Sequence, residues 1–438
     1  MTYNLLHYDP IQGYDGEAHH AYVQNFLNMF GPNKTSQPGS NFTYEFFSPP
    51  LPYILPVFIN EICKYYSSSE NYLEYCQDVY GFLNIIFLSI IFIGLLFIYM
   101  KIIKKVLKLE KLQNVSILLL LGLFSINYKA ISMIRAEIYV IFLSAILIYR
   151  LLVLAEKSFI YELNDLVIFG LLIGLLALSR QWAFLLFPGY FLLIFFIEKD
   201  FRKSFLKFLT YSFLIGFSIS SWFYFGLFLD YGSFTSFNME SKGFSFKNFS
   251  SSFFFLSTEG QAYFFTKPIR PYFENSFLPI LYSDLWGDYW GYFSFTSRSL
   301  DIGRNQLLIG DYLGKVNVIS LFPMTLLLLG LKNSIKAFKN KQKSSLEILN
   351  IYIVFSIIFS FLGYLWFLVS YPEITGDTTK SVYMIQLFHL LGLGAIIYIE
   401  QIKKKEIKVF YVIQVALLTV FLHNFQTMLS HFPKIDIF

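Results

Sequence analysis

Long apolar segments alternate with short polar ones along most of the chain. An apolar run of about 17–25 residues is long enough to cross the hydrocarbon core of a bilayer as a helix. Runs that reach or approach this length lie at about 81–100, 114–128, 131–155, 163–179, 182–198, 204–229, 314–335, 347–370, 380–400 and 407–429. The pattern predicts an all-α, polytopic membrane protein with about ten transmembrane helices, organised as a single domain over residues 1–438.

Composition agrees with this prediction. The chain is 55% hydrophobic and only 14% charged, and its mean hydropathy is +0.54. These values lie outside the range of soluble domains, and we expect membrane lipid, and no nucleic acid, among its partners.

The loops between the apolar runs differ in charge. Basic loops occur at 101–111, 198–207, 332–343 and 400–408. An even number of predicted spans separates each from the next, so all four face the same side, which the positive-inside rule identifies as the cytoplasm. The alternate loops then face outward, at 1–80, 128–130, 180–181, 230–313 and 371–379.

The predicted outer segments hold most of the acidic residues, so we expect function on the outer face. The segment 48–66 is apolar and opens with several prolines, which favours a helix lying at the membrane interface. The segment 230–313 is too long for a simple connector, and we expect it to fold over the outer helix ends. Because no spanning helix precedes the first outer segment, we also expect an upstream helix, which would make eleven.

Two further local patterns lead to structural expectations. The runs 114–128 and 131–155 are separated only by residues in the stretch NYK, which predicts a tight helical hairpin with its turn at the membrane surface. Cys63 and Cys76 are the two cysteines of the chain. Both lie in a predicted outer segment, where a disulfide is possible, but we expect two unpaired thiols.

Titratable residues are concentrated in the stretch GYDGEAHHAYV, residues 13–23. Asp15 directly precedes a predicted helix, so it can act as its N-cap. Alternatively, a carboxylate at the membrane surface can act as a general base. Glu17, His19 and His20 have the chemistry of metal ligands, but no specific zinc pattern completes the set, and we expect no metal and no cofactor.

The order of these motifs resembles the GT-C superfamily of glycosyltransferases, in the branch of the protein O-mannosyltransferases and lipid A aminoarabinose transferases. The resemblance is carried by YDGEAHHAYV, PPLPYIL, MIRAEIYVIFLSAILIY and, more weakly, GDTTKSVYMIQLF. It implies an inverting transferase whose donor is a sugar on a polyprenyl phosphate. It assigns the base role to Asp15 and a supporting role to Glu17.

A polyprenyl-phosphate donor requires cations at the outer ends of helices to hold its phosphate. Arg135, Arg180 and Lys380 lie at predicted outer ends, against the inward bias of basic residues. Tyr383 follows Lys380 by one turn and can add a hydrogen bond to the phosphate. The alternative for each cation is snorkelling of its side chain to the interface.

The predicted outer stretch LYSDLWGDYWGYF, residues 281–293, offers groups that suit a sugar. Aromatic faces stack on pyranose rings, and carboxylates bind hydroxyls. Candidates for binding sugar or acceptor are therefore His19, Asp284, Trp286, Asp288 and Trp290. An aromatic belt at the membrane interface is the alternative for this stretch.

The leading hypothesis is an inverting glycosyltransferase in the plasma (inner) membrane, acting at the outer face on an unknown acceptor. One rival is a transporter or flippase of a lipid-linked sugar, but we find no repeat of the first half of the chain in the second. Another rival is a surface polysaccharide polymerase or ligase, which would be expected to use basic residues in the 230–313 loop.

Overall fold

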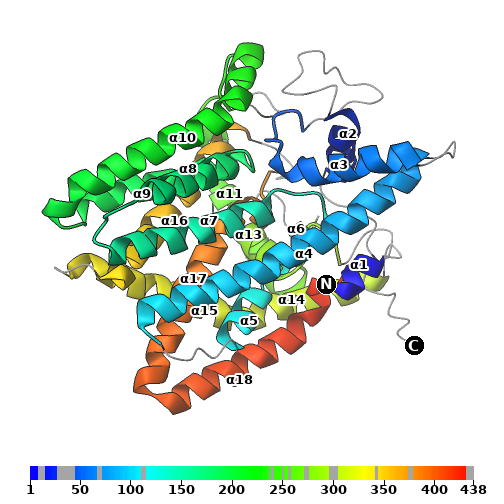
Figure 1. Cartoon of the computed structure of the whole chain (residues 1–438). Helices are drawn as coiled ribbons and strands as arrows, with labels where there is room; N and C mark the ends of the chain where they lie inside the picture. The colour runs from blue at the N-terminus through cyan, green and yellow to red at the C-terminus, as the bar shows by residue number, and fades with distance from the viewer. Residues whose placement is uncertain are drawn as a thin grey trace.

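The computed structural model describes residues 1–7, 15–26, 45–66, 72–109, 115–235, 237, 241–248, 251–254, 258–270, 276–294, 304–340, 344–372 and 378–430. These residues form helices and connecting segments, and none of them lies in a strand. The helices of the first half (Figure 1) are α1 Thr2–His7, α2 Gly16–Asn25, α3 Leu51–Tyr66, α4 Tyr72–Leu107, α5 Val115–Gly122, α6 Ser125–Ser132, α7 Glu137–Glu156, α8 Leu163–Ala177, η2 Gln181–Leu186, α9 Phe187–Leu192, η3 Leu193–Phe195 and α10 Lys199–Tyr231.

The second half continues in the same all-helical manner. Its helices are η4 Phe246–Asn248, α11 Ser251–Phe254, α12 Thr258–Thr266, α13 Phe277–Trp286, α14 Arg304–Ile319, α15 Leu321–Ile335, η5 Lys336–Lys339, α16 Ser345–Ser370, η6 Ser381–Met384, α17 Ile385–Lys405, α18 Ile407–Asn424 and η7 Phe425–Met428.

Several helices are long and apolar enough to cross a membrane. Among the described residues seven qualify, at Tyr75–Leu107, Glu137–Glu156, Lys199–Tyr231, Ile309–Lys339, Ser345–Ser370, Ser381–Lys405 and Ile407–Met428. An eighth span is reached if the bent pair α5 and α6 counts as one. The prediction of an all-α, multi-pass membrane protein is thus confirmed, and each predicted apolar run overlaps helical structure. Two of them, Leu163–Ala177 and Gln181–Phe195, are shorter apolar helices.

The predicted hairpin turn at NYK is wrong. These residues lie inside α6, and the axes of α5 and α6 meet at 74°. The chain leaves helical geometry again at Met133, before α7 begins. The physical reason is tertiary, because Lys129 is buried and forms an ion pair with Asp284 that keeps this segment inside the protein.

Helix α17 is the centre of the bundle. Its spanning window is 89% buried, against 28% for the window of α18. It packs against α15, α16, α18, α5 and α7. Lys380 lies at the N-terminal end of this central helix, directly before η6.

The C-terminal ends of several spanning helices meet at one end of the bundle, where basic residues gather. Lys105 of α4 contacts Glu156 of α7 at 2.5 Å. Lys404 of α17 donates a hydrogen bond to the carbonyl oxygen of Leu107, at the end of α4, at 3.0 Å. Helices α4, α7 and α17 therefore run in the same direction, and the segments before α7 and α17 lie at the opposite end.

Helix α3 carries apolar side chains on its outer surface. Tyr53 and Val57 are buried, whereas Ile54, Phe58 and Ile62 are 43–63% exposed and follow one another at helical spacing. An exposed apolar face is typical of a helix that lies in a membrane interface.

A disulfide joins Cys63 of α3 to Cys76 of α4, so the expectation of two unpaired thiols is wrong. The two helices pack against each other and are separated by only a short connection, residues 67–71. This packing brings the two Cα atoms to 5.7 Å, within the range that a disulfide requires.

The described part of the segment 230–313 packs against the bundle. Helix α13 contacts α6 and η6, and α12 contacts α14. From Ile309 onward, α14 continues into a candidate span that ends at Lys339.

Candidate functional site

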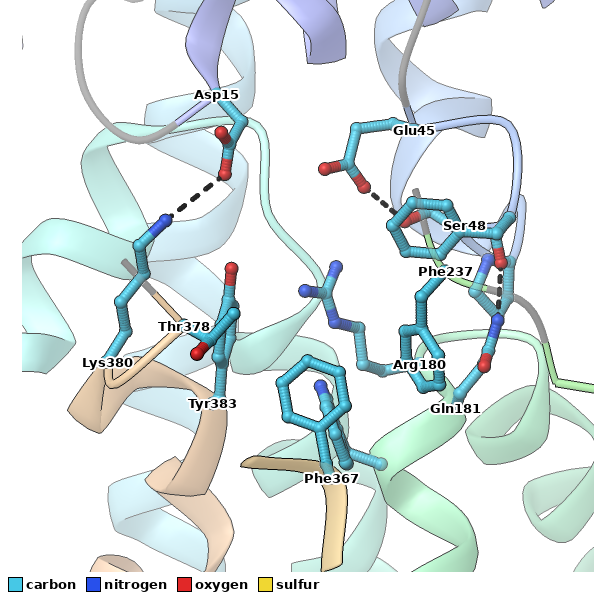
Figure 2. A pocket seen from close by; sticks show the side chains of 13 residues that line it. Asp15, Glu45, Ser48, Arg180, Gln181, Phe237, Phe367, Thr378, Lys380 and Tyr383 are labelled. Atoms are coloured by element: carbon cyan, nitrogen blue, oxygen red, sulfur yellow. Dashed lines mark hydrogen bonds and ion pairs between the residues drawn. The ribbon is translucent and has the colours of Figure 1, made fainter. Parts of the chain in front are cut away.

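A cavity of about 350 Å³ lies among Asp15, residues 45–49, the start of η2, the C-terminal end of α16 and the segment that leads into η6 and α17 (Figure 2). Its lining residues come from segments far apart in the sequence, and they are Asp15, Glu45, Phe47, Ser48, Pro49, Arg180, Gln181, Trp182, Phe237, Phe367, Thr378, Lys380 and Tyr383. The predicted residues Asp15, Arg180, Lys380 and Tyr383 are thus brought together.

Asp15 occupies the N-cap position of α2, but its side chain does not cap the helix. Its backbone is left-handed, with φ at 55°, a conformation that Asp tolerates better than most residues. The carboxylate therefore points away from the amides of α2 and toward Lys380 (Figure 2). The alternative in which the Asp15 side chain caps α2 is therefore wrong.

Two cations converge on one oxygen of Asp15. Lys380 Nζ lies 3.4 Å and an Arg135 guanidinium nitrogen 3.9 Å from Oδ2. Partial burial alone would raise the pKa of Asp15, but the charges of Lys380 and then Arg135 outweigh it and lower this pKa to about 2. The Asp15 carboxylate is therefore ionised at neutral pH, and 44% of the side chain is exposed.

Residues 378–381, the segment that bears Lys380, are held by hydrogen bonds to Tyr364 and to Asp284. The Tyr364 hydroxyl accepts a hydrogen bond from the Lys380 backbone nitrogen at 2.9 Å and donates one to the Thr378 carbonyl oxygen at 2.7 Å. The next residue, Ser381, donates its backbone N–H to Asp284 Oδ2 at 2.8 Å. These bonds orient Lys380 toward the cavity.

Arg180 lines the cavity together with Lys380, and we call these two cations the cationic wall. Arg180 lies 3.8 Å from Glu137 Oε1, and its guanidinium group is 5.5 Å from the centre of the Tyr383 ring. Lys380 Nζ is 5.6 Å from the same ring. In Figure 2 the Tyr383 side chain stands between those of Lys380 and Arg180.

Aromatic side chains form the adjoining wall. The Trp182 ring packs against Phe367 at 4.9 Å and Phe237 at 5.9 Å between ring centres, and it stacks on Tyr383 at 6.3 Å. This surface borders the cationic wall directly. The cavity thus offers charge on one side and apolar ring faces on the other.

Glu45 is a second carboxylate of the cavity, which the sequence analysis missed. It is 5% exposed and accepts a hydrogen bond from the Ser48 hydroxyl at 2.5 Å. Its local sequence gives no signal, because the proximity of Glu45 to Arg180 arises only in the fold.

His19 lies behind Glu45 and does not line the cavity. Its Nε2 is 4.0 Å from Glu45 Oε1, and its Nδ1 shares a hydrogen bond with the Tyr53 hydroxyl at 2.7 Å. Burial, and then the charge of Arg135, lower the pKa of His19 well below its usual value. His19 is therefore neutral, and it packs against the Glu45 carboxylate on the side away from the cavity.

Other predicted site residues lie elsewhere. Glu17 is exposed on α2 and does not line the cavity. Asp284, Trp286, Asp288 and Trp290 do not line it either, because they are at most 5% exposed in the protein interior. They pack against α6 and the segment 378–381 instead, and their expected role in binding sugar or acceptor stays a prediction.

Lys129 is the partner that the sequence analysis did not find. Its Nζ lies 2.7 Å from Asp284 Oδ1 and 3.6 Å from Asp288 Oδ1. The Trp290 indole donates to the Thr379 carbonyl oxygen at 3.2 Å. We call Lys129, Asp284 and Asp288 the buried cluster. The sequence offers one signal for Lys129, a lone lysine between two apolar runs, but it predicts an outer turn there rather than a buried ion pair.

Within the described ranges, no group of three or more His, Cys, Asp and Glu side chains is arranged to hold a metal ion. His20, considered as a ligand from the sequence, instead shares a hydrogen bond with the Tyr80 hydroxyl at 2.7 Å.

Comparisons of the chain with protein-family models, with curated proteins and with solved structures gave no match.

Proposed function

We propose that the protein is an inverting glycosyltransferase that takes a sugar from a polyprenyl-phosphate carrier. The observation that carries this proposal is the meeting of the Asp15 carboxylate with Lys380 and Arg135 at a cavity that Arg180 also lines. A transferase for such a donor needs a base for the acceptor and cations for the departing phosphate, and the cavity combines both.

In this mechanism, the acceptor oxygen attacks the anomeric carbon of the donor from the face opposite the phosphate. A bond forms between these two atoms as the bond from the anomeric carbon to the phosphate oxygen breaks. The acceptor proton passes to Asp15, and the electron pair leaves with the polyprenyl phosphate. Lys380, Arg135 and Arg180 stabilise the charge on the leaving phosphate, and Tyr383 donates a hydrogen bond to it.

The size and lining of the cavity support a monosaccharide donor. A volume of about 350 Å³ is near the lower end of the roughly 300–1,000 Å³ of small-molecule sites. The rings of Trp182 and Phe367 offer faces on which a pyranose can stack. Glu45 lies on the same side of the cavity as Asp15 (Figure 2) and suits hydrogen bonds to sugar or acceptor hydroxyls. We assign no role in the reaction to Glu17 or to the buried cluster.

We further propose ten spans, with the cavity on the outer face of the plasma membrane. Three features support this orientation. The basic helix ends gather at the end of the bundle opposite the cavity. The disulfide near the cavity end suits an oxidising compartment. Helix α3 presents an apolar face suited to the interface.

The test is transfer of labelled sugar from a panel of synthetic polyprenyl-phosphate monosaccharides by membranes that contain the protein. Asp15→Asn should lower transfer by about 10²–10⁴-fold, because it removes the proton acceptor but keeps the shape. Glu17→Gln is the matched control, since it neutralises an exposed carboxylate two residues away, and it should leave transfer unchanged. Equal transfer by wild type and Asp15→Asn would reject the proposal, and movement of lipid without transfer would favour a flippase.

A further inference from the structure

The cations around the cavity are already paired with carboxylates of the protein. Lys380 and Arg135 face Asp15, and Arg180 faces Glu137. An anionic ligand that enters the cavity therefore meets cations whose charge is largely compensated. It gains their full attraction only if one of these carboxylates moves away.

Asp15 is the carboxylate that is able to move. Its contacts of 3.4 and 3.9 Å are longer than the roughly 2.7–2.9 Å of a direct charge-assisted hydrogen bond. Its side chain is 44% exposed, whereas that of Glu137 is 3% exposed. The two cations are themselves buried, at 1% and 10% exposure, so Asp15 can leave only if another anion takes over its contacts.

The geometry also identifies what replaces it. Both cations converge on the single oxygen Oδ2, and the Lys380 side chain lies in the cavity wall beside Tyr383. A phosphate oxygen placed there would take over both contacts. Asp15 would then lose the two charges that hold its pKa at about 2 and would return toward the ordinary basicity of a carboxylate.

We propose that Asp15 is an internal competitor of the donor phosphate. In the free protein it occupies the place of a phosphate oxygen at Lys380 and Arg135, and donor binding displaces it. The carboxylate becomes an effective proton acceptor only when the phosphate is in place, so donor binding precedes activation of the acceptor. The identity of the ligand rests on the proposed function, whereas the competition itself rests on the ion pairs.

The test is binding of a short-chain polyprenyl phosphate, which carries no sugar, to the purified full-length protein in detergent at neutral pH. Asp15→Asn removes the competing charge, so we expect it to bind the probe about tenfold more tightly than wild type. Glu17→Gln should bind as wild type does. Lys380→Gln should bind more weakly, and adding Asp15→Asn to it should restore little, because the two residues act through the same contact.

Two further probes identify the source of the phosphate. Inorganic phosphate that binds more tightly to Asp15→Asn would show that the subsite recognises phosphate alone. Tightening that is seen only with the lipid would show that chain and phosphate bind together, and the uncharged polyprenol should show no tightening. Asp15→Ser is a second variant that guards against misfolding of Asp15→Asn.

Unchanged or weaker binding of polyprenyl phosphate by both Asp15 variants would overturn this proposal, as would absence of binding by every variant. The result is separable from the transfer assay. Tighter binding by Asp15→Asn without any sugar transfer by wild type would retain the competition and reject the transferase. Sugar transfer that depends on Asp15, without tighter binding, would do the reverse.

Discussion

Asp15 with Lys380 and Arg135, which we call the cavity cluster, and the buried cluster lie on either side of residues 378–381. The two clusters differ in the exposure of their side chains and in the length of their contacts. Asp15 at the cavity is 44% exposed, and its cationic contacts are 3.4 and 3.9 Å long. In the buried cluster the side chains of Lys129, Asp284 and Asp288 are at most 1% exposed, and the shortest contact is 2.7 Å. Residues Thr378–Ser381 contact both.

Backbone groups explain the difference. Lys129 also donates to the carbonyl oxygen of Gly287 at 3.1 Å, and Asp288 accepts from the backbone nitrogens of Phe293 and Ser294 at 3.2 and 2.8 Å. Charges that are enclosed and bound by backbone groups in this way hold segments together but have little capacity to exchange partners. The cavity cluster is partly solvated and is therefore able to accept a ligand.

The strongest way to break the comparison is Lys129→Met. This change leaves two buried carboxylates without their cation, so we expect a loss of about 3–5 kcal/mol in the free energy of unfolding. Thermal unfolding and size-exclusion chromatography in detergent measure the effect. Lys157→Met, at a side chain that is 48% exposed, is the control and should leave stability nearly unchanged. Wild-type stability of Lys129→Met would show that the buried cluster is not structural.

A second, smaller effect should separate the positioning of Lys380 from the stability of the whole protein. Tyr364→Phe removes the hydroxyl that bonds the Thr378 carbonyl and the Lys380 nitrogen. We expect a loss of about 1 kcal/mol in stability and a several-fold rise in KM for the donor, because Lys380 loses its alignment. Tyr312→Phe removes a comparable hydroxyl, bonded to His423, and should cost similar stability without raising KM. Equal KM values in the two variants would contradict a positioning role for Tyr364.

The smallest expected effect is the pH dependence of the Asp15 ion pair. The pKa of Asp15 is lowered from 3.8 to about 2 on folding, so ionised Asp15 stabilises the protein above about pH 4. This contribution is lost as the pH falls from about 4 to about 2. Because the side chain is 44% exposed, we expect it to be below about 1 kcal/mol.

The measurement is the difference in unfolding temperature between wild type and Asp15→Asn at several pH values. It should be constant above pH 4 and vanish toward pH 2. If the unfolding temperature of wild type instead rises relative to that of Asp15→Asn as the pH falls, the pKa of Asp15 is raised in the folded protein rather than lowered.

The sequence was informative where local physics decides the outcome. Apolar runs predicted the helices because a helix in a bilayer must satisfy its backbone internally and present apolar side chains over its whole length. The proline-rich segment 48–66 was predicted to form a helix at the membrane interface, and it does contain helix α3, whose outer surface is apolar. Asp15, Arg180, Lys380 and Tyr383 were selected by their chemistry and expected sidedness, and they share one cavity.

The sequence was uninformative where two distant segments must meet. Lys129 and Asp284 are 155 residues apart, so nothing near either residue indicates that they form an ion pair. The same limit applies to Glu45, which meets Arg180 only in the fold, and to the four residues of 284–290 that the sequence places at a sugar site. Chemical type alone does not distinguish an enclosed carboxylate from one that faces a cavity.

The sequence by itself determined the all-helical, membrane-spanning class of this protein and the residues that were candidates for chemistry, because hydropathy and charge act locally and add along the chain. The tertiary structure alone decided which charges became structural and which stayed exchangeable. The reason is that burial and saturation by backbone groups depend on helix packing, and this packing encloses Asp284 and leaves Asp15 at the cavity.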